Sequence, residues 1–283
     1  MQPICGAGKQ DCDACHLDIG QSRSQGPRPM ESAETFTTVD SVFVRHRNAL
    51  LLRGQFTPIY TDYYLHLMDH GVRHPPEIDG MLKDALAMLT LHLVARPWAE
   101  TIAWTANLRA PRINLFVTGC STAEAVTGRL FTEDVREPDR NYFYAQTTTD
   151  DAPEPRLSTL EVDGRNPVKW VEQYYLQSEQ RPARAFRLDD EQYALVAAQP
   201  DCEMDWFESL DARAVAEMDV REETGLLERR RFRFFCGCSL ERILPILGGW
   251  RDKPEELFDG ADAIMIQCPR CAAKYEVTRG MLG

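Results

Sequence analysis

Two pairs of cysteines near the carboxyl end of the chain have the residue types and the spacing to do chemistry. Cys236 and Cys238 lie in the segment FFCGCS, and after 29 intervening residues Cys268 and Cys271 lie in QCPRCAAKY. Two close pairs of soft ligands suit tetrahedral Zn²⁺, whose bonds to sulfur of about 2.3 Å require four sulfurs that converge from two turns. The spacing within each pair permits that geometry.

Two other interpretations of these cysteines explain less. Four buried cysteines could simply pack as small apolar residues, but two pairs flanked by strand-like FRFF and AIMIQ favour a metal site. A thioredoxin-like redox pair at Cys268 and Cys271 would leave the first pair unexplained, and the strand and helix that normally carry that motif are missing there. We therefore expect one Zn²⁺ per chain, bound by Cys236, Cys238, Cys268 and Cys271.

Four thiolate ligands leave no open coordination position, so we expect a structural zinc rather than one that assists hydrolysis. The bound sulfurs are electron-rich, so peroxide or hypochlorite can convert them to sulfenic acid and then to disulfides, which releases the metal. Structural zinc contributes about 10 to 16 kcal/mol to the folding of a small module, whereas whole domains are stable by only about 5 to 15 kcal/mol. Oxidation should therefore unfold the module and expose apolar surface, which binds unfolded chains.

The elements that must position the cysteines predict an α+β fold. Short alternating runs between residues 101 and 162 are typical of strands separated by turns. Prolines and helical spacing of apolar residues predict helices near Thr57, after Pro76 and from Pro167. Because the strands cluster along the chain, an α+β fold is favoured over a doubly wound sheet.

We predict four parts in the 283 residues. Residues 1–35 are polar and rich in Gly, Ser and Pro, which indicates a disordered tail, and residues 36–200 form an N-terminal mixed α/β core domain. Residues 201–230 are charge-rich with sparse apolar positions, which is typical of a helical linker. Residues 231–283 form a small C-terminal zinc-binding redox-switch domain, which is too short to be stable on hydrophobic burial alone.

The charge balance excludes some function classes. The chain has 32 Lys and Arg against 44 Asp and Glu, a formal net charge of −12, which argues against nonspecific binding to nucleic acid or an anionic membrane. The longest apolar stretch, residues 85–95, is far shorter than the roughly 20 residues that span a bilayer, and no secretory signal is visible. We expect a cytoplasmic protein, where nine cysteines point to metal binding or thiol chemistry.

Four segments together resemble one known family. They are C-x-C-S-x-E-R at residues 236–242, C-x-x-C-x-x-K-Y at 268–275, YYLQSEQRP at 174–182, and the pair Arg53-Gly54. These segments resemble the redox-regulated thirty-three-kilodalton heat-shock chaperones of bacteria, over about residues 45–283. The cysteine motif is the most specific part of the resemblance.

The resemblance implies an ATP-independent holdase for unfolded or aggregation-prone proteins, inactive while reduced and zinc-bound, and active after oxidation releases the zinc. In that family disulfides then join neighbouring cysteines, here Cys236 with Cys238 and Cys268 with Cys271, and the active form is often a homodimer. The role of zinc ligand carries over to the same four cysteines. No client-binding residue can be named, because a promiscuous apolar surface leaves no local motif.

The alternative function is a zinc-ribbon module that binds nucleic acid or a protein partner without chaperone activity. The basic run at residues 229–233 could contact RNA, although its alternating aromatic residues are more typical of a strand that enters the zinc site. An enzyme is not expected, since nothing in the sequence supplies both a nucleophile and a positioned base.

Cysteines of the tail form a second candidate site. Cys12, Cys15 and His16 match the attachment pattern of c-type haem, which we interpret as chance because no export signal is visible. Together with Cys5 they could form a metal site, and disordered, oxidisable thiols are the simpler interpretation.

Three further polar residues share one face of the first predicted helix. His66 and His70 lie four residues apart with Asp62 one turn earlier. They could bind a metal, although a solvated polar face is the commoner explanation of such a pattern. Cys120 and Cys202 are single cysteines, which we interpret as a core filler and a linker thiol.

Overall fold

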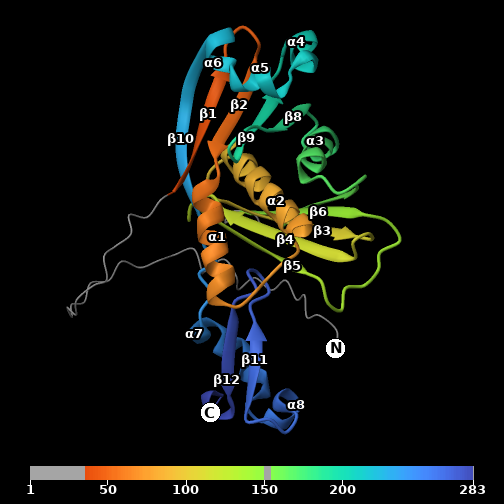
Figure 1. The fold of residues 1–283 in the computed structure, drawn as a ribbon, viewed down its shortest axis with the longest axis vertical. Helices are drawn as coiled ribbons and strands as arrows, with labels where there is room; N and C mark the ends of the chain where they lie inside the picture. Colours follow the sequence, from red (N-terminus) through yellow and green to blue (C-terminus); the bar gives the residue numbers. More distant parts are fainter. Residues whose placement is uncertain (1–35, 150–153, 283) are drawn as a thin grey trace, which may run out of the picture.

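The computed structural model describes residues 36–149 and 154–282, so the cysteines of the tail lie outside the described residues. The described chain is an elongated α+β body with a small module at one end (Figure 1). This architecture confirms the α+β expectation. The strands are β1 (Thr37–Val44), β2 (Ala49–Gln55), β3 (Glu100–Leu108), β4 (Ile113–Cys120), β5 (Ala125–Phe131), β6 (Tyr142–Thr149), β7 (Arg156–Glu161), β8 (Ala183–Arg187), β9 (Gln192–Ala198), β10 (Thr224–Phe234), β11 (Ala263–Gln267) and β12 (Lys274–Thr278).

Eight α-helices and two 3₁₀ segments of the described residues surround these strands (Figure 1). The expected helices near Thr57, Pro76 and Pro167 are all present. The helices are α1 (Thr57–Asp69), α2 (Pro76–Val94), α3 (Pro167–Gln177), α4 (Met204–Ser209), α5 (Ala212–Ala216), α6 (Met218–Arg221), α7 (Leu240–Ile243) and α8 (Pro254–Phe258), with 3₁₀ turns at Leu244–Trp250 and Arg279–Met281.

Strand β10 joins the two halves of a ten-stranded sheet, whose order is β7-β6-β3-β4-β5-β10-β1-β2-β9-β8. It pairs antiparallel with β1, from Thr224 opposite Val44 to Phe232 opposite Thr37. Its last two residues then pair in parallel with β5. The prediction of a helical linker over residues 201–230 is therefore wrong for residues 224–230, because pairing with β1 overrides the helical propensity of their Leu, Glu and Arg side chains.

Helix α2 forms the centre of the core. It contacts β4 and β5 on one half of the sheet, β9 on the other half, and helix α3. From Leu82 onward nearly every side chain of α2 is buried, which fits a helix that is apolar on all sides. Within the described residues, no helix has both the length and the apolar character needed to cross a membrane.

Helix α1 lies across β10 and points its carboxyl end at the small module (Figure 1). Tyr60 and Tyr63 are buried. Tyr64 is 41% exposed, and its hydroxyl donates a hydrogen bond of 2.7 Å to a carboxylate oxygen of Asp79. The buried stripe of α1 is therefore narrow, and the end of the helix contacts the module.

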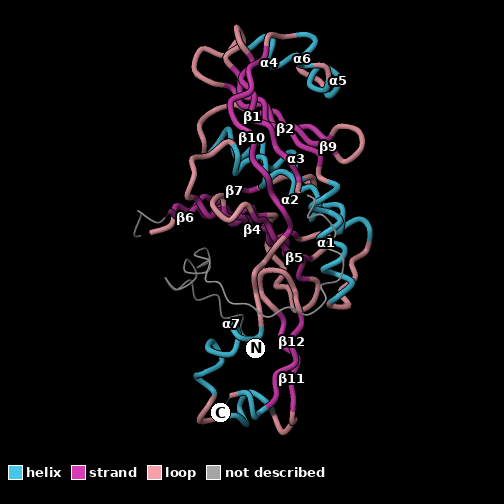
Figure 2. The backbone as a smooth tube through the Cα atoms, turned by 90° about the vertical axis from the view of Figure 1, so that its left-hand side faces the viewer, coloured by secondary structure: helices cyan, strands magenta, loops and turns pink. Residues whose placement is uncertain are grey.

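Helices α4, α5 and α6 cover one face of the sheet near the end opposite the small module (Figure 2). Successive residues of a strand point to opposite faces. In β2, accordingly, Leu51 packs under these helices, whereas Leu52 packs in the main core. The helices bury Phe207, Leu210, Val215 and Met218 on the sheet. The helical part of the predicted linker is thus a cover over an apolar face, which we call the α4–α6 cover.

The small C-terminal module contains the hairpin of β11 and β12, which pair antiparallel, with α7, α8 and the 3₁₀ turns beside it. Its own apolar cluster has few fully buried members among the described residues, and these are Leu247, Phe258, Val277 and Leu282. So small a core contributes little net stability once chain entropy is counted. We therefore expect that the module needs a further cross-link to stay folded.

His92 of α2 is a fully buried imidazole that gives the core a pH dependence. Its Nδ1 is 2.9 Å from the hydroxyl of Tyr175, and its ring packs against Trp104 and Tyr174. Burial, helped by the charge of Arg96, lowers the pKa of His92 well below the ordinary value of a histidine, about 6.5. The folded core therefore holds this ring neutral, whereas the unfolded chain protonates it below about pH 6.5.

We predict that the stabilising contribution of a neutral His92 is complete above pH 6.5 and is lost as the pH falls below that value. The loss approaches about 1.4 kcal/mol of unfolding free energy per pH unit, the slope of one proton taken up on unfolding. Denaturant unfolding of the wild type and of His92→Gln between pH 5 and 8 checks this, since the variant lacks the proton site. Equal slopes for the two proteins would contradict the assignment.

Candidate metal centre

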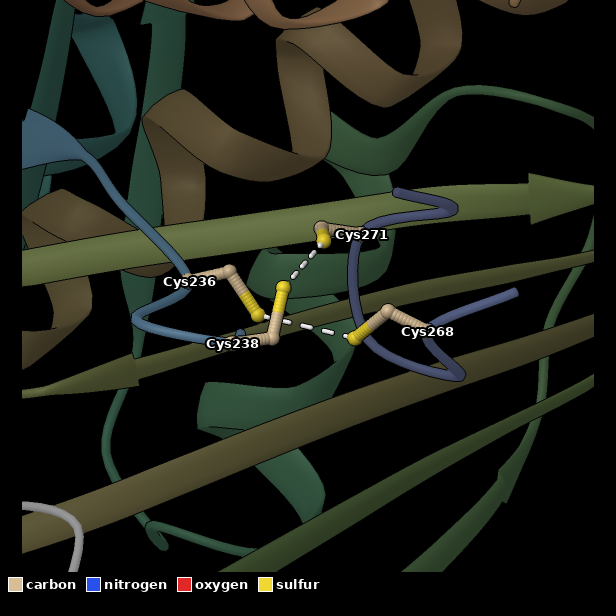
Figure 3. Close-up of side chains that lie close together, drawn as sticks. All are labelled: Cys236, Cys238, Cys268 and Cys271. Atoms are coloured by element: carbon tan, nitrogen blue, oxygen red, sulfur yellow. Dashed lines mark hydrogen bonds between the residues drawn. The ribbon is translucent and has the colours of Figure 1, made fainter. Parts of the chain in front are cut away.

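The four sulfurs predicted as ligands converge on one point. The Sγ atoms of Cys236, Cys238, Cys268 and Cys271 all lie within 4.8 Å of one another. Figure 3 marks two of these pairs, in which the sulfur of Cys236 lies 3.8 Å from that of Cys268 and the sulfur of Cys238 lies 3.4 Å from that of Cys271. Zinc–sulfur bonds of about 2.3 Å in a tetrahedron set sulfur atoms about 3.8 Å apart. The cluster thus matches a tetrathiolate metal site in number, type and spacing of donors.

The first pair of cysteines directly follows strand β10. The backbone NH of Phe235 still bonds to the carbonyl of Val126, at 2.9 Å, so the core fixes the start of this turn. Gly237 then adopts a φ of +68°, which glycine tolerates without strain. Arg242 donates a hydrogen bond of 2.7 Å to the carbonyl of Gly237 and holds the turn closed.

The second pair lies in the turn between β11 and β12. The NH of Cys268 donates to the carbonyl of Ala273 at 2.8 Å, and the NH of Ala272 donates back to the carbonyl of Cys268 at 3.0 Å. Ala272 has a φ of +63°, which a non-glycine residue adopts only where the fold demands it. Cys268 and Cys271 are buried, so this turn, called the second knuckle (residues 268–274), places two thiols out of contact with water.

The four thiols shift one another's protonation. A hydrogen bond with Cys236 lowers the pKa of Cys238 to about 7 and also lowers the pKa of Cys268 well below its usual range. Hydrogen bonds within the cluster raise the pKa of Cys236 and of Cys271, because a thiol among thiolates keeps its proton. A cation held by all four sulfurs would displace these last protons.

Tyr275 supports the cluster from outside the ligand set. Its hydroxyl donates a hydrogen bond of 3.0 Å to the carbonyl of Cys238 and lies 3.2 Å from the sulfur of the same residue. Burial and the neighbouring thiol raise the pKa of Tyr275, so the hydroxyl stays protonated and remains a donor. Groups that hold the ligands in this way orient a metal site and tune its affinity.

The residues Asp62, His66 and His70 do not form a metal site of their own. In the part of the chain that the structure describes, only the four cysteines group closely enough to hold an ion. The two histidines instead contact the second knuckle. The Nε2 of His66 donates to the carbonyl of Cys271 at 2.8 Å, and the Nδ1 of His70 accepts from the backbone NH of Lys274 at 3.2 Å. Sequence spacing revealed their shared face but not this contact.

The basic run at residues 229–233 is not a continuous cationic surface. Arg229 forms a two-point ion pair with Asp40, at 2.6 and 3.0 Å. Arg230 is only 1% exposed and donates hydrogen bonds to the carbonyls of Leu93 and Ser121. These contacts weaken the alternative of an RNA-binding ribbon.

The two single cysteines lie outside the cluster, and their burial agrees with a cysteine packed in the core and a cysteine in the linker. Cys120 is buried at the end of β4, with its sulfur 3.2 Å from the hydroxyl of Thr122. Cys202 is half-buried just before α4, and burial raises the pKa of its thiol. They provide natural controls for the chemistry of the cluster.

The fold and the site define a class of protein: a mixed α+β body whose small end module is built around four converging thiols. The structure is similar to the crystal structure of the 33 kDa chaperonin (heat shock protein 33 homolog) from Thermotoga maritima, with a TM-score of 0.65. The two chains are 13% identical, and the similarity covers 87% of this chain and 96% of that one. No protein-family model and no curated protein matches the sequence. The chain therefore has the fold of heat shock protein 33 on a strongly divergent sequence.

Proposed function

We propose that this protein is an ATP-independent holdase whose binding of unfolded proteins is controlled by the redox state of the four cysteines. The observation that carries the proposal is the convergence of four thiols from two turns, in a module with a very small apolar core. The similarity in fold to a 33 kDa chaperonin supports the same function.

In the reduced protein, Cys236, Cys238, Cys268 and Cys271 would bind one Zn²⁺ per chain. Bound zinc supplies a cross-link between the two turns and no reaction of its own, because four sulfur ligands close its coordination sphere. The cross-link keeps the module folded and the α4–α6 cover in place. The protein in this state is an inactive holdase, and it is not an enzyme.

Oxidation removes the ligands. In the proposed step, one molecule of peroxide takes two electrons from each pair of thiolates, so that one S–S bond forms and the O–O bond breaks, and two protons from the solvent complete two molecules of water. The proposed disulfides join Cys236 to Cys238 and Cys268 to Cys271. No thiolate is then left for the metal, and the module loses the cross-link on which its folding depends.

Strand β10 is the proposed route from the module to the α4–α6 cover, which lie at opposite ends of the molecule (Figure 2). The strand begins three residues after α6 and ends two residues before Cys236. Its first half is held by its pairing with β1 and buries little apolar surface, since Leu226 and Leu227 are 57% and 63% exposed. Unfolding at Cys236 would loosen β10, release the cover, and expose the apolar side chains beneath it to clients.

The proposed clients are unfolded or aggregation-prone proteins of the cytoplasm, bound through apolar surface without sequence preference. We propose no membrane partner, and we propose a homodimer as a form of the oxidised protein, since newly exposed apolar faces can also pair with each other. Nucleic acid is not a proposed partner, given the ion pair of Arg229 and the burial of Arg230.

The test is suppression of aggregation by the full chain before and after oxidation. Thermally unfolded citrate synthase serves as the client, and the protein is treated with peroxide at mildly raised temperature or kept reduced with zinc. We expect light scattering of the client to fall only with the oxidised protein. Equal suppression before and after oxidation would contradict the redox switch.

A matched variant isolates the four cysteines from the other five. Replacing Cys5, Cys12, Cys15, Cys120 and Cys202 with serine or alanine leaves only the cluster, and this variant should still be activated by peroxide.

Binding of RNA that weakens with salt, together with no effect on aggregation of the client, would favour the zinc-ribbon alternative.

A further inference from the structure

Arg129 belongs to the α+β body and contacts the backbone of the second knuckle without being a metal ligand. It lies on β5, and its guanidinium donates hydrogen bonds to the carbonyl of Cys268 at 2.7 Å and to the side-chain oxygen of Gln267 at 3.0 Å. The central carbon of its guanidinium lies over the ring of Phe131, 4.0 Å from the ring centroid. Three separate contacts therefore fix one cation at the boundary between the core and the second knuckle.

The contacts of Arg129 belong to a set that holds this knuckle by its backbone. His66 bonds to the carbonyl of Cys271, and His70 bonds to the NH of Lys274. Backbone groups at these positions face the core only while the knuckle keeps its folded turn. Loss of the turn would therefore break the contacts of all three core side chains together.

The contact of Arg129 with the second knuckle depends on the charge of the sulfurs as well as on the shape of the turn. Four thiolates around a divalent cation carry a net charge of about −2, and the buried cysteines have little water to screen it. Burial lowers the pKa of the Arg129 guanidinium, and negative charge on the sulfurs of Cys268 and Cys271 acts in the opposite direction, because it favours the charged guanidinium. When the thiolates become disulfides the cluster turns neutral, and this attraction disappears.

We propose that Arg129 is a positioning residue that docks the second knuckle on the core while the knuckle carries thiolate charge, and releases it when the thiols are oxidised. The inference rests on the proposed metal centre but not on chaperone activity. Since docking and metal binding stabilise the same turn, each strengthens the other by the same factor. Removing Arg129 should therefore weaken metal binding, although the residue is not a ligand.

The experiment compares Arg129→Gln and Arg129→Lys with the wild type, in the reduced full chain. The zinc affinity of each is measured by competition with a chromophoric chelator. We expect Arg129→Gln to bind zinc about tenfold more weakly, the lower end of the range for supporting residues around metal sites. Arg129→Lys retains the charge and should recover part of the affinity, which a purely steric role would not predict. Arg136, an exposed arginine, provides the control variant Arg136→Gln, with unchanged affinity.

Further measurements distinguish a failure of the Arg129 inference from a failure of the proposed metal centre. The thermal stability of the zinc-free core should differ between Arg129→Gln and wild type only by the lost contact with Phe131, because the released knuckle no longer contacts Arg129. Wild-type zinc affinity in Arg129→Gln would overturn this inference and leave the metal centre standing. Absence of zinc binding by the wild type would overturn the proposed metal centre and this inference with it.

Discussion

Replacing Cys268 and Cys271 with serine is expected to abolish metal binding and to unfold the C-terminal module while the α+β core stays folded. A structural zinc contributes about 10 to 16 kcal/mol to a module of this kind, and the apolar cluster around Leu247 and Phe258 is too small to compensate. Amide hydrogen exchange read by mass spectrometry tests this. Peptides covering residues 240–282 should lose protection, whereas those of α2 should keep it.

The control is the double variant Cys120→Ala and Cys202→Ser, which removes two thiols outside the cluster. It should retain one zinc per chain and full protection of the module, with only a small loss of core stability where Cys120 packs. A module that stays protected after the loss of Cys268 and Cys271 would show that its folding does not depend on the metal.

Weakening the α4–α6 cover should give a holdase that needs no oxidant. Phe207 and Met218 are almost fully buried against the sheet. Truncating a buried Phe or Met to alanine costs about 2 to 5 kcal/mol, and short helices have little stability of their own. The variant Phe207→Ala with Met218→Ala should therefore suppress client aggregation while reduced and zinc-bound, to an extent close to that of oxidised wild type.

Val220 offers a matched control in the same segment, because its side chain is 90% exposed. Val220→Ala should remain inactive until oxidised. Binding of an apolar fluorescent dye should rise in the double variant and not in the control, since only the former uncovers the sheet face. If the dye binds but client aggregation is unchanged, then the face under the cover is not the surface that holds clients.

The metal centre could be predicted because its signal is local. The spacing of Cys236 with Cys238, and of Cys268 with Cys271, already limits the chemistry, and the structure needs only to bring two turns together. Helices α1, α2 and α3 could be predicted for a related reason. Each begins beside a proline and carries apolar residues at helical spacing, so the sequence near each element determines it.

The first part of strand β10, residues 224–228, was missed because long-range pairing determines it, whereas the aromatic alternation at residues 229–233 already indicated a strand. None of residues 224–228 is buried, so no alternation of buried and exposed side chains marks this part of the strand. Its partner β1 lies far away in the sequence, so no local pattern shows the pairing. The docking contacts of His66 and Arg129 were missed for the same reason, since they join β5 and α1 to a turn more than 130 residues further along the chain.

The most direct test of the central claim is the metal bound by the cluster itself. The variant that retains only Cys236, Cys238, Cys268 and Cys271 would be loaded with Co²⁺ in place of zinc, and its absorption and metal content measured before and after peroxide. We predict one Co²⁺ per chain with the intense bands of tetrahedral thiolate coordination, lost together with four free thiols on oxidation. A substoichiometric metal content, or a spectrum without thiolate bands, would contradict the account.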